Sequence, residues 1–126
     1  MPRRFDHIDL RAPSIVSVES FYSALLPALG FTRDLTIPNW LQYYAPEEGV
    51  TEFFGITASP NHVPNENRIA FWAADKAEVD SLAKLLHEIG AKNIEGPGYD
   101  EGPDYYAVFF EDPVGNRLEV CHREKN

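Results

Sequence analysis

At residues 112–120 the chain reads DPVGNRLEV, a tight turn that runs directly into a strand. Proline presets the backbone φ of a turn, and Gly115 tolerates the positive φ that most residues avoid. In the strand that follows, Leu118 and Val120 alternate with polar residues, so the two kinds of side chain lie on opposite faces. Glu119 is therefore predicted on the face opposite the apolar residues. Such a carboxylate lies either on the solvated outer face of a sheet or on a concave face lined with ligands.

Composition restricts the class of protein. The 126 residues are 44% hydrophobic and 25% charged, which is typical of one folded globular domain. A net charge of -9 disfavours nucleic acid and anionic membranes as partners, because both repel an acidic protein. The single cysteine, Cys121, excludes an internal disulfide and favours a reducing compartment. No apolar run reads as a signal peptide or a membrane span, so the cytoplasm is the expected location.

An order of strand, helix and three strands is predicted twice along the chain. Apolar residues at helical spacing predict the helices, and alternating apolar and polar residues predict the strands. The first half is expected to contain a helix at 16–29 and strands at 5–11, 31–36, 41–45 and 51–57. A polar connector at 58–67 follows. The second half is expected to contain a helix at 77–89, strands at 68–73, 92–95, 105–111 and 117–122, and a loop at 96–104.

Capping residues mark the ends of both predicted helices. Ser14 and Asp75 are predicted N-caps, and Gly30 and Gly90 are predicted stops. In each half, one set of apolar residues is predicted to pack between helix and sheet: Ile8, Leu10, Phe21, Leu25, Ile69, Phe71, Leu82, Leu86, Leu118 and Val120.

The two halves repeat with similar spacing. The first helix stop lies 23 positions after His7, and the second lies 22 positions after Arg68. When the halves are aligned on these residues, the last strands superpose with Glu52 over Glu119. Repetition of a unit that cannot cover its sheet alone indicates that two units pair. The predicted fold class is therefore α+β, with the helices outside one curved sheet.

Four motifs together resemble one superfamily. They read FDHIDLR at 5–11, FY at 21–22 followed by LGF at 29–31, RIAF at 68–71 and FEDPVGNRLE at 110–119, and the last is the most specific. In this combination the chain resembles the vicinal oxygen chelate superfamily, which includes glyoxalase I, extradiol dioxygenases, fosfomycin resistance enzymes and bleomycin resistance proteins. The resemblance implies a single glyoxalase-like domain over residues 1–126. It also implies two βαβββ modules, at about 5–57 and 68–123, that form an open, cup-shaped mixed sheet.

The resemblance further implies a divalent metal in the cup, held by ligands from the first and last strand of each module. Carried over to this sequence, those positions are His7, Glu52, Arg68 and Glu119. Metal-dependent relatives usually carry histidine at the third position. A guanidinium stays protonated and has no lone pair to donate, so Arg68 cannot be a ligand. The predicted ligands are therefore His7, Glu52 and Glu119, and the predicted cofactor is Zn, Ni, Mn or Fe.

Two functions are open at this point. The first is a metal-dependent lyase, isomerase or dioxygenase that acts on a small molecule with vicinal oxygens, with Glu119 as the catalytic base. In that case Arg68 turns outward and binds an anionic group of the substrate. The second is a metal-free protein that sequesters a small molecule or drug, as bleomycin resistance proteins do. In that case Arg68 turns inward and pairs with Glu52 or Glu119.

Aromatic residues near these positions are candidates for the pocket wall. Trp72 shares the face of Arg68 by alternation, and it joins Arg68, Phe54 and Tyr105 as a predicted substrate-binding residue. No glycine-rich phosphate loop follows a strand, so a nucleotide cofactor is not expected, and the expected partner is a small-molecule substrate. Sheet edges need covering and relatives cover them by pairing, so a homodimer is expected.

Overall fold

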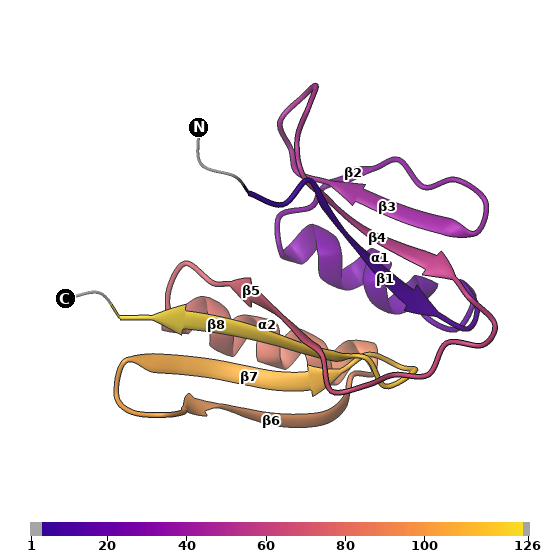
Figure 1. The fold of residues 1–126 in the computed structure, drawn as a ribbon. Helices are drawn as coiled ribbons and strands as arrows, with labels where there is room; N and C mark the ends of the chain where they lie inside the picture. The colour runs from indigo at the N-terminus through magenta and orange to yellow at the C-terminus, as the bar shows by residue number, and fades with distance from the viewer. Residues whose placement is uncertain (1–3, 125–126) are drawn as a thin grey trace. The chain divides into compact units, whose positions relative to one another are not determined.

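The structure of the chain, a computed structural model, describes residues 4–124. The described chain forms two compact units, residues 4–63 and 64–124, each with its own sheet and helix (Figure 1). The boundary between the units falls within the predicted connector at 58–67. The outermost ends of the predicted domain, 1–3 and 125–126, lie outside the described residues. The joining of the two modules into a single cup-shaped domain stays a prediction.

The first unit contains one helix and a four-stranded sheet. Its elements are β1 (His7–Ala12), α1 (Glu19–Ala28), β2 (Arg33–Asp34), β3 (Trp40–Tyr44) and β4 (Phe53–Ala58). The strands lie in the order β1-β4-β3-β2, with β1 parallel to β4 and the other pairs antiparallel. The sheet packs on α1 through side chains such as Phe54, whose ring centre lies 6.1 Å from that of Tyr22.

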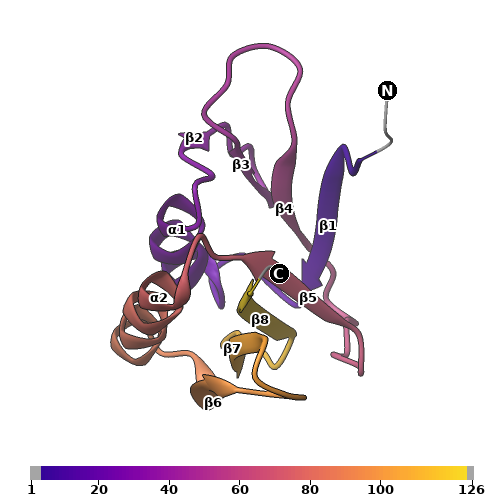
Figure 2. The ribbon, with the colours of Figure 1, turned by 90° about the vertical axis from the view of Figure 1, so that its left-hand side faces the viewer.

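The second unit repeats this topology. Its elements are β5 (Arg68–Trp72), α2 (Lys76–Ile89), β6 (Lys92–Tyr99), β7 (Tyr105–Glu111) and β8 (Arg117–Arg123). The strands lie in the order β5-β8-β7-β6, and the first pair is again parallel. Figure 2 shows α2 lying along one face of this sheet. The predicted α+β fold, with strand, helix and three strands twice, is confirmed, and a doubly wound parallel sheet is excluded.

The two helices differ in how well their starts were predicted. In α2, Asp75 is the N-cap and its carboxylate accepts a hydrogen bond from the Glu78 backbone at 2.8 Å, as predicted. Gly90 ends α2 with a left-handed φ of 88°. The helix α1 begins at Glu19 instead of residue 16, so Ser14 is not its N-cap. Residues 14–18 form a separate turn, in which the Ser14 hydroxyl accepts from the Ser17 backbone at 3.3 Å.

The predicted apolar set packs between helix and sheet in each unit. Phe21, Leu25, Leu86, Leu118 and Val120 have at most 1% of their surface exposed. The residues of the set on the edge strands β1 and β5 are only half-buried, because an edge strand has a neighbour on one side. None of the described helices is long and apolar enough to cross a membrane.

The turn at 112–116 is built around a buried carboxylate. Asp112 has no exposed surface, and it accepts hydrogen bonds from the Val114 and Asn116 backbone at 3.0 and 2.9 Å and from the Asn116 side chain at 2.9 Å. Gly115 has a φ of 98°, which its lack of a side chain permits. This turn fixes the start of β8 and hence the place of Glu119.

Strand β6 is longer than predicted. It runs from Lys92 to Tyr99 instead of ending at residue 95.

Candidate functional site

We call the sheet face opposite the helix of the same unit its open face. In the second unit, Glu119 lies on this face near the middle of β8, with only 5% of its surface exposed. The Tyr105 hydroxyl donates a hydrogen bond to Glu119 Oε2, and the Arg123 guanidinium lies 4.4 Å from the centre of the Tyr105 ring. Burial raises the pKa of the Glu119 carboxyl, and the positive charge of Arg68 opposes the rise. Glu119 therefore takes up a proton more readily than an exposed glutamate.

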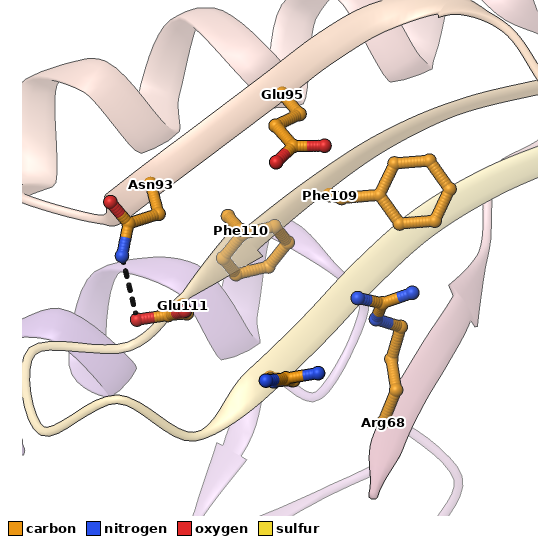
Figure 3. Close-up of a pocket in the computed structure, with 7 residues that line it drawn as sticks. Arg68, Asn93, Glu95, Phe109, Phe110 and Glu111 are labelled. Atoms are coloured by element: carbon orange, nitrogen blue, oxygen red, sulfur yellow. Dashed lines mark hydrogen bonds between the residues drawn. The ribbon is translucent and has the colours of Figure 1, made fainter. Parts of the chain in front are cut away.

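A pocket of about 220 Å³ opens on the same unit, and its lining comes from four strands (Figure 3). The Arg68 guanidinium lies 4.9 Å from the centre of the Phe109 ring, in cation–π contact. On the other side of the pocket the Asn93 amide donates to Glu111 Oε1 at 3.0 Å. The lining residues are Arg68, Asn93, Glu95, Phe109, Phe110, Glu111 and Arg117.

The surroundings of Arg68 within its own unit bear on the two orientations expected for it. Among the described residues of the second unit, no carboxylate lies within ion-pair distance of Arg68, so the pairing with Glu119 is not formed, and pairing with Glu52 stays a prediction. The guanidinium points instead toward Phe109 and the pocket. This is the outward orientation, which suits contact with an anionic group of a ligand.

In the first unit the open face carries a row of stacked rings. The His7 imidazole stacks on Phe53 at 4.6 Å between ring centres, and Phe53 stacks on Tyr44 at 4.5 Å. Arg33 ends the row, 5.7 Å from the centre of the Tyr44 ring. His7 Nδ1 also lies 2.8 Å from a carboxylate oxygen of Asp6. The row crosses all four strands, so this face is largely filled by its own side chains.

The strand register shows which positions of the two units correspond. The parallel ladders begin with His7 opposite Phe53 and with Arg68 opposite Arg117. Two residues further on, Asp9 lies opposite Gly55, and Ala70 lies opposite Glu119. Gly55 of β4 is therefore the counterpart of Glu119 of β8.

The counterpart of Glu119 thus lacks a side chain, and Trp40 covers it. A Cβ added to Gly55 would lie 2.8 Å from Trp40 Nε1 and 3.3 Å from the Phe53 ring. The place that a ligand side chain would need is occupied by the indole.

Glu52 lies just outside the strand in which it is predicted. The last strand of the first half, β4, begins at Phe53, one residue after Glu52, and the Glu52 side chain is exposed. Its carbonyl accepts from the Ala45 backbone at 3.0 Å. Alignment of the buried pair Phe54 and Ile56 on the corresponding apolar pair of β8 identifies Gly55 from the sequence. The alternation of apolar residues therefore gives the correct counterpart of Glu119, whereas a count of residues from His7 does not. Whether Glu52 binds a ligand stays a prediction.

The other three predicted substrate-binding residues lie in different environments: one is exposed, one contacts Glu119 and one belongs to the core. Trp72 is on the open face and 71% exposed, on the edge strand β5. Tyr105 contacts Glu119 rather than the pocket. Phe54 is 1% exposed and belongs to the core, so it has no surface to offer a ligand. Sequence reasoning missed Phe109 and Arg117, although both share the face of Glu119 by alternation and by register.

The donor set does not fit the divalent metal that the resemblance implies. Of the four corresponding positions, His7 and Glu119 have donor atoms, Arg68 has a guanidinium, and Gly55 has no side chain. Metal centres of this kind use at least three protein ligands. Within each unit, the described residues also include no group of three or more His, Cys, Asp or Glu side chains that could share a metal ion.

Comparison with known proteins gives the same family as the motifs. The model of the Glyoxalase/Bleomycin resistance protein/Dioxygenase superfamily matches residues 4–120. Among solved structures, a glyoxalase/bleomycin resistance protein from Albidiferax ferrireducens is 26% identical, with a TM-score of 0.76 over 95% of this chain and 98% of that one.

Two further structures are similar in fold. An enzyme of the glyoxalase/bleomycin resistance protein/dioxygenase family from Burkholderia phytofirmans is 14% identical, with a TM-score of 0.73 over 94% of this chain and 98% of that one. The fosfomycin resistance protein FosX from Mesorhizobium loti is 16% identical, with a TM-score of 0.70 over 98% and 95%. No curated protein matches the sequence. Since the match to the superfamily extends over most of its length, the chain belongs to the glyoxalase/bleomycin resistance protein/dioxygenase superfamily.

Proposed function

We propose that this chain is a binding protein that holds a small organic molecule without a metal. The observation that carries this proposal is the residue at the first-strand position of the second unit. Arg68 cannot donate a lone pair, and its fixed positive charge repels a cation bound nearby. The same guanidinium faces a pocket, where it is suited to an anionic group of an organic ligand.

The first unit supports the same proposal. With Gly55 in the place of a carboxylate and the Trp40 indole packed over it, that unit contributes His7 alone at the corresponding positions. A single imidazole and a single carboxylate leave a divalent ion with at least as many open positions as protein ligands. Sequestration of a small molecule needs no such ion, only a pocket with well-placed polar groups.

Metal content tests the proposal. The protein is purified without chelators from cells grown with Zn, Ni, Mn and Fe, and the metals are measured by elemental analysis beside His7→Ala and Glu119→Gln. We expect far less than one metal per chain in all three proteins. About one metal per chain in the wild type, lost in both variants, would overturn the proposal.

A metal-dependent lyase, isomerase or dioxygenase is the second candidate, and the outward orientation of Arg68 is the one expected for it. Two observations favour it: His7 lies on the open face with 41% of its side chain exposed, and Glu119 is a buried acid with a raised pKa. Stoichiometric metal held by these two residues would make this candidate the better one. A homodimer and a cytoplasmic location stay predictions.

A further inference from the structure

Two arginines of the pocket lie side by side without carboxylate partners. Arg68 of β5 and Arg117 of β8 are opposite each other in the parallel ladder, so their side chains leave the sheet on the same face. Both are exposed, and neither takes part in an ion pair with a described residue. Like charges directly opposite each other in a sheet are unfavourable. An anionic group placed between the two guanidinium groups removes that repulsion and forms charge-assisted hydrogen bonds.

A carboxylate lies on the opposite side of the same pocket. Glu95 of β6 lies opposite Phe109 of β7, whereas Glu111 of β7 lies opposite Arg117 in the antiparallel ladder without forming an ion pair with it. Glu111 already accepts from Asn93, whereas Glu95 has no ion-pair partner in the described part of the chain. In Figure 3 the Glu95 carboxylate and the Arg68 guanidinium lie on either side of the Phe109 ring.

From this charge arrangement, and resting on the proposed function, we infer that the ligand is a small zwitterion. Its acid group, a carboxylate or a phosphate, binds between Arg68 and Arg117. Its amino group binds Glu95, and its apolar middle lies against Phe109. The volume of about 220 Å³ is far more than one water needs. That volume suits a molecule the size of an amino acid.

Simpler ligands fit the pocket less well. A dianion would gain from the arginines but would meet the negative charges of Glu95 and Glu111. A cation would gain from the glutamates but would meet Arg68 and Arg117. A neutral molecule would leave the adjacent guanidinium charges unrelieved. Only a molecule with both charges, one at each end, complements both sides of the pocket.

Four matched probes separate these contributions: 4-(aminomethyl)benzoate, benzoate, benzylamine and benzyl alcohol. They share one ring and carry, in turn, both charges, the acid, the amine and neither. Binding is measured on the full chain by titration with two-dimensional NMR, which reports affinity and location together. We expect 4-(aminomethyl)benzoate to bind about tenfold more tightly than benzoate, and benzoate more tightly than the other two probes. The shifted amides should belong to β5, β6, β7 and β8.

Substitutions then assign each charge to its partner. Arg117→Gln should weaken both acids about tenfold, and Glu95→Gln should reduce 4-(aminomethyl)benzoate to the affinity of benzoate without changing benzoate itself. The controls are Arg4→Gln and Glu88→Gln, which remove the same charges at exposed positions outside the pocket.

Different results refute the ligand class and the proposed function. Equal affinity for all four probes, no binding of either acid, or acid binding that survives Arg117→Gln would overturn the zwitterion assignment. None of these outcomes changes the metal content, which tests the proposed function. Stoichiometric metal together with normal binding of 4-(aminomethyl)benzoate would refute the metal-free function and leave the zwitterion assignment in place.

Discussion

The two units have the same strand order and the same parallel pairing of first and last strands, yet their open faces differ in chemistry. In the first unit the face is filled by a row of rings that includes His7, Phe53 and Tyr44. In the second unit the corresponding face carries charged side chains around a pocket, with Arg68 at the place of His7. The helix-facing side is apolar in both. The two units therefore share the apolar residues that specify the backbone fold, while the side chains on the open face differ from one unit to the other.

The turns before the last strands differ as much as the faces. The turn at 112–116 is held by the buried Asp112, whereas the loop at 46–50 in the first unit is exposed throughout. A buried acceptor for three donors fixes the start of β8 and therefore places Glu119. The exposed loop imposes no such constraint on β4, whose register differs from the one that spacing predicts.

The largest effect is expected from Asp112→Ala. It leaves the Val114 and Asn116 donors without their buried acceptor, and it should lower the free energy of unfolding by about 3 kcal/mol. Urea unfolding measures the change. The control in the first unit, Glu48→Ala, removes a carboxylate from the exposed loop and should change stability by less than about 0.5 kcal/mol. Equal effects of the two substitutions would contradict the difference between the turns.

A smaller effect is expected from Gly55→Ala. The new Cβ would lie 2.8 Å from Trp40 Nε1, so the indole or the strand must shift, at a cost of about 2 kcal/mol. Gly98→Ala is the matched control in the second unit, since nothing lies within 4 Å of a Cβ added there. It should be neutral or slightly stabilising, because alanine restricts the unfolded chain more than glycine does. Thermal and urea unfolding of both variants check the prediction, and a tolerated Gly55→Ala would show that Trp40 does not occupy the site.

The smallest effect concerns the pH dependence of stability. Burial raises the pKa of Glu119, so the folded protein holds this proton up to a higher pH than the unfolded chain does. Stability should fall as the pH rises from about 4.3, the ordinary glutamate value, through the raised pKa of Glu119. Glu119→Gln should remove this fall in stability with rising pH. Glu95→Gln, which changes an exposed carboxylate, should retain it. The measurement is urea unfolding across that range, and parallel curves for wild type and Glu119→Gln would exclude the raised pKa.

Much of the fold was predictable from the sequence because it depends on local patterns. Alternation around Leu118 and the caps at Asp75 and Gly90 specify strands and helix ends without reference to distant residues. The candidate site was harder to predict. The position of Gly55 depends on the register between β1 and β4, which a count of residues through an exposed loop cannot give. The contact of Arg68 with Phe109 depends on the pairing of β5 with β8, which lies far from β5 in sequence.

We propose that Arg68 and Gly55 stand where a metal centre would have ligands. Calorimetric titration of the metal-free protein with Ni²⁺, beside Arg68→His, is the sharpest test of this replacement. We expect no saturable binding to the wild type. If the first and last strands converge as the resemblance implies, Arg68→His supplies a third donor to His7 and Glu119, and stoichiometric binding should appear. Stoichiometric Ni²⁺ binding by the wild type, abolished by Glu119→Gln, would show that Arg68 and Gly55 leave a working metal centre in place.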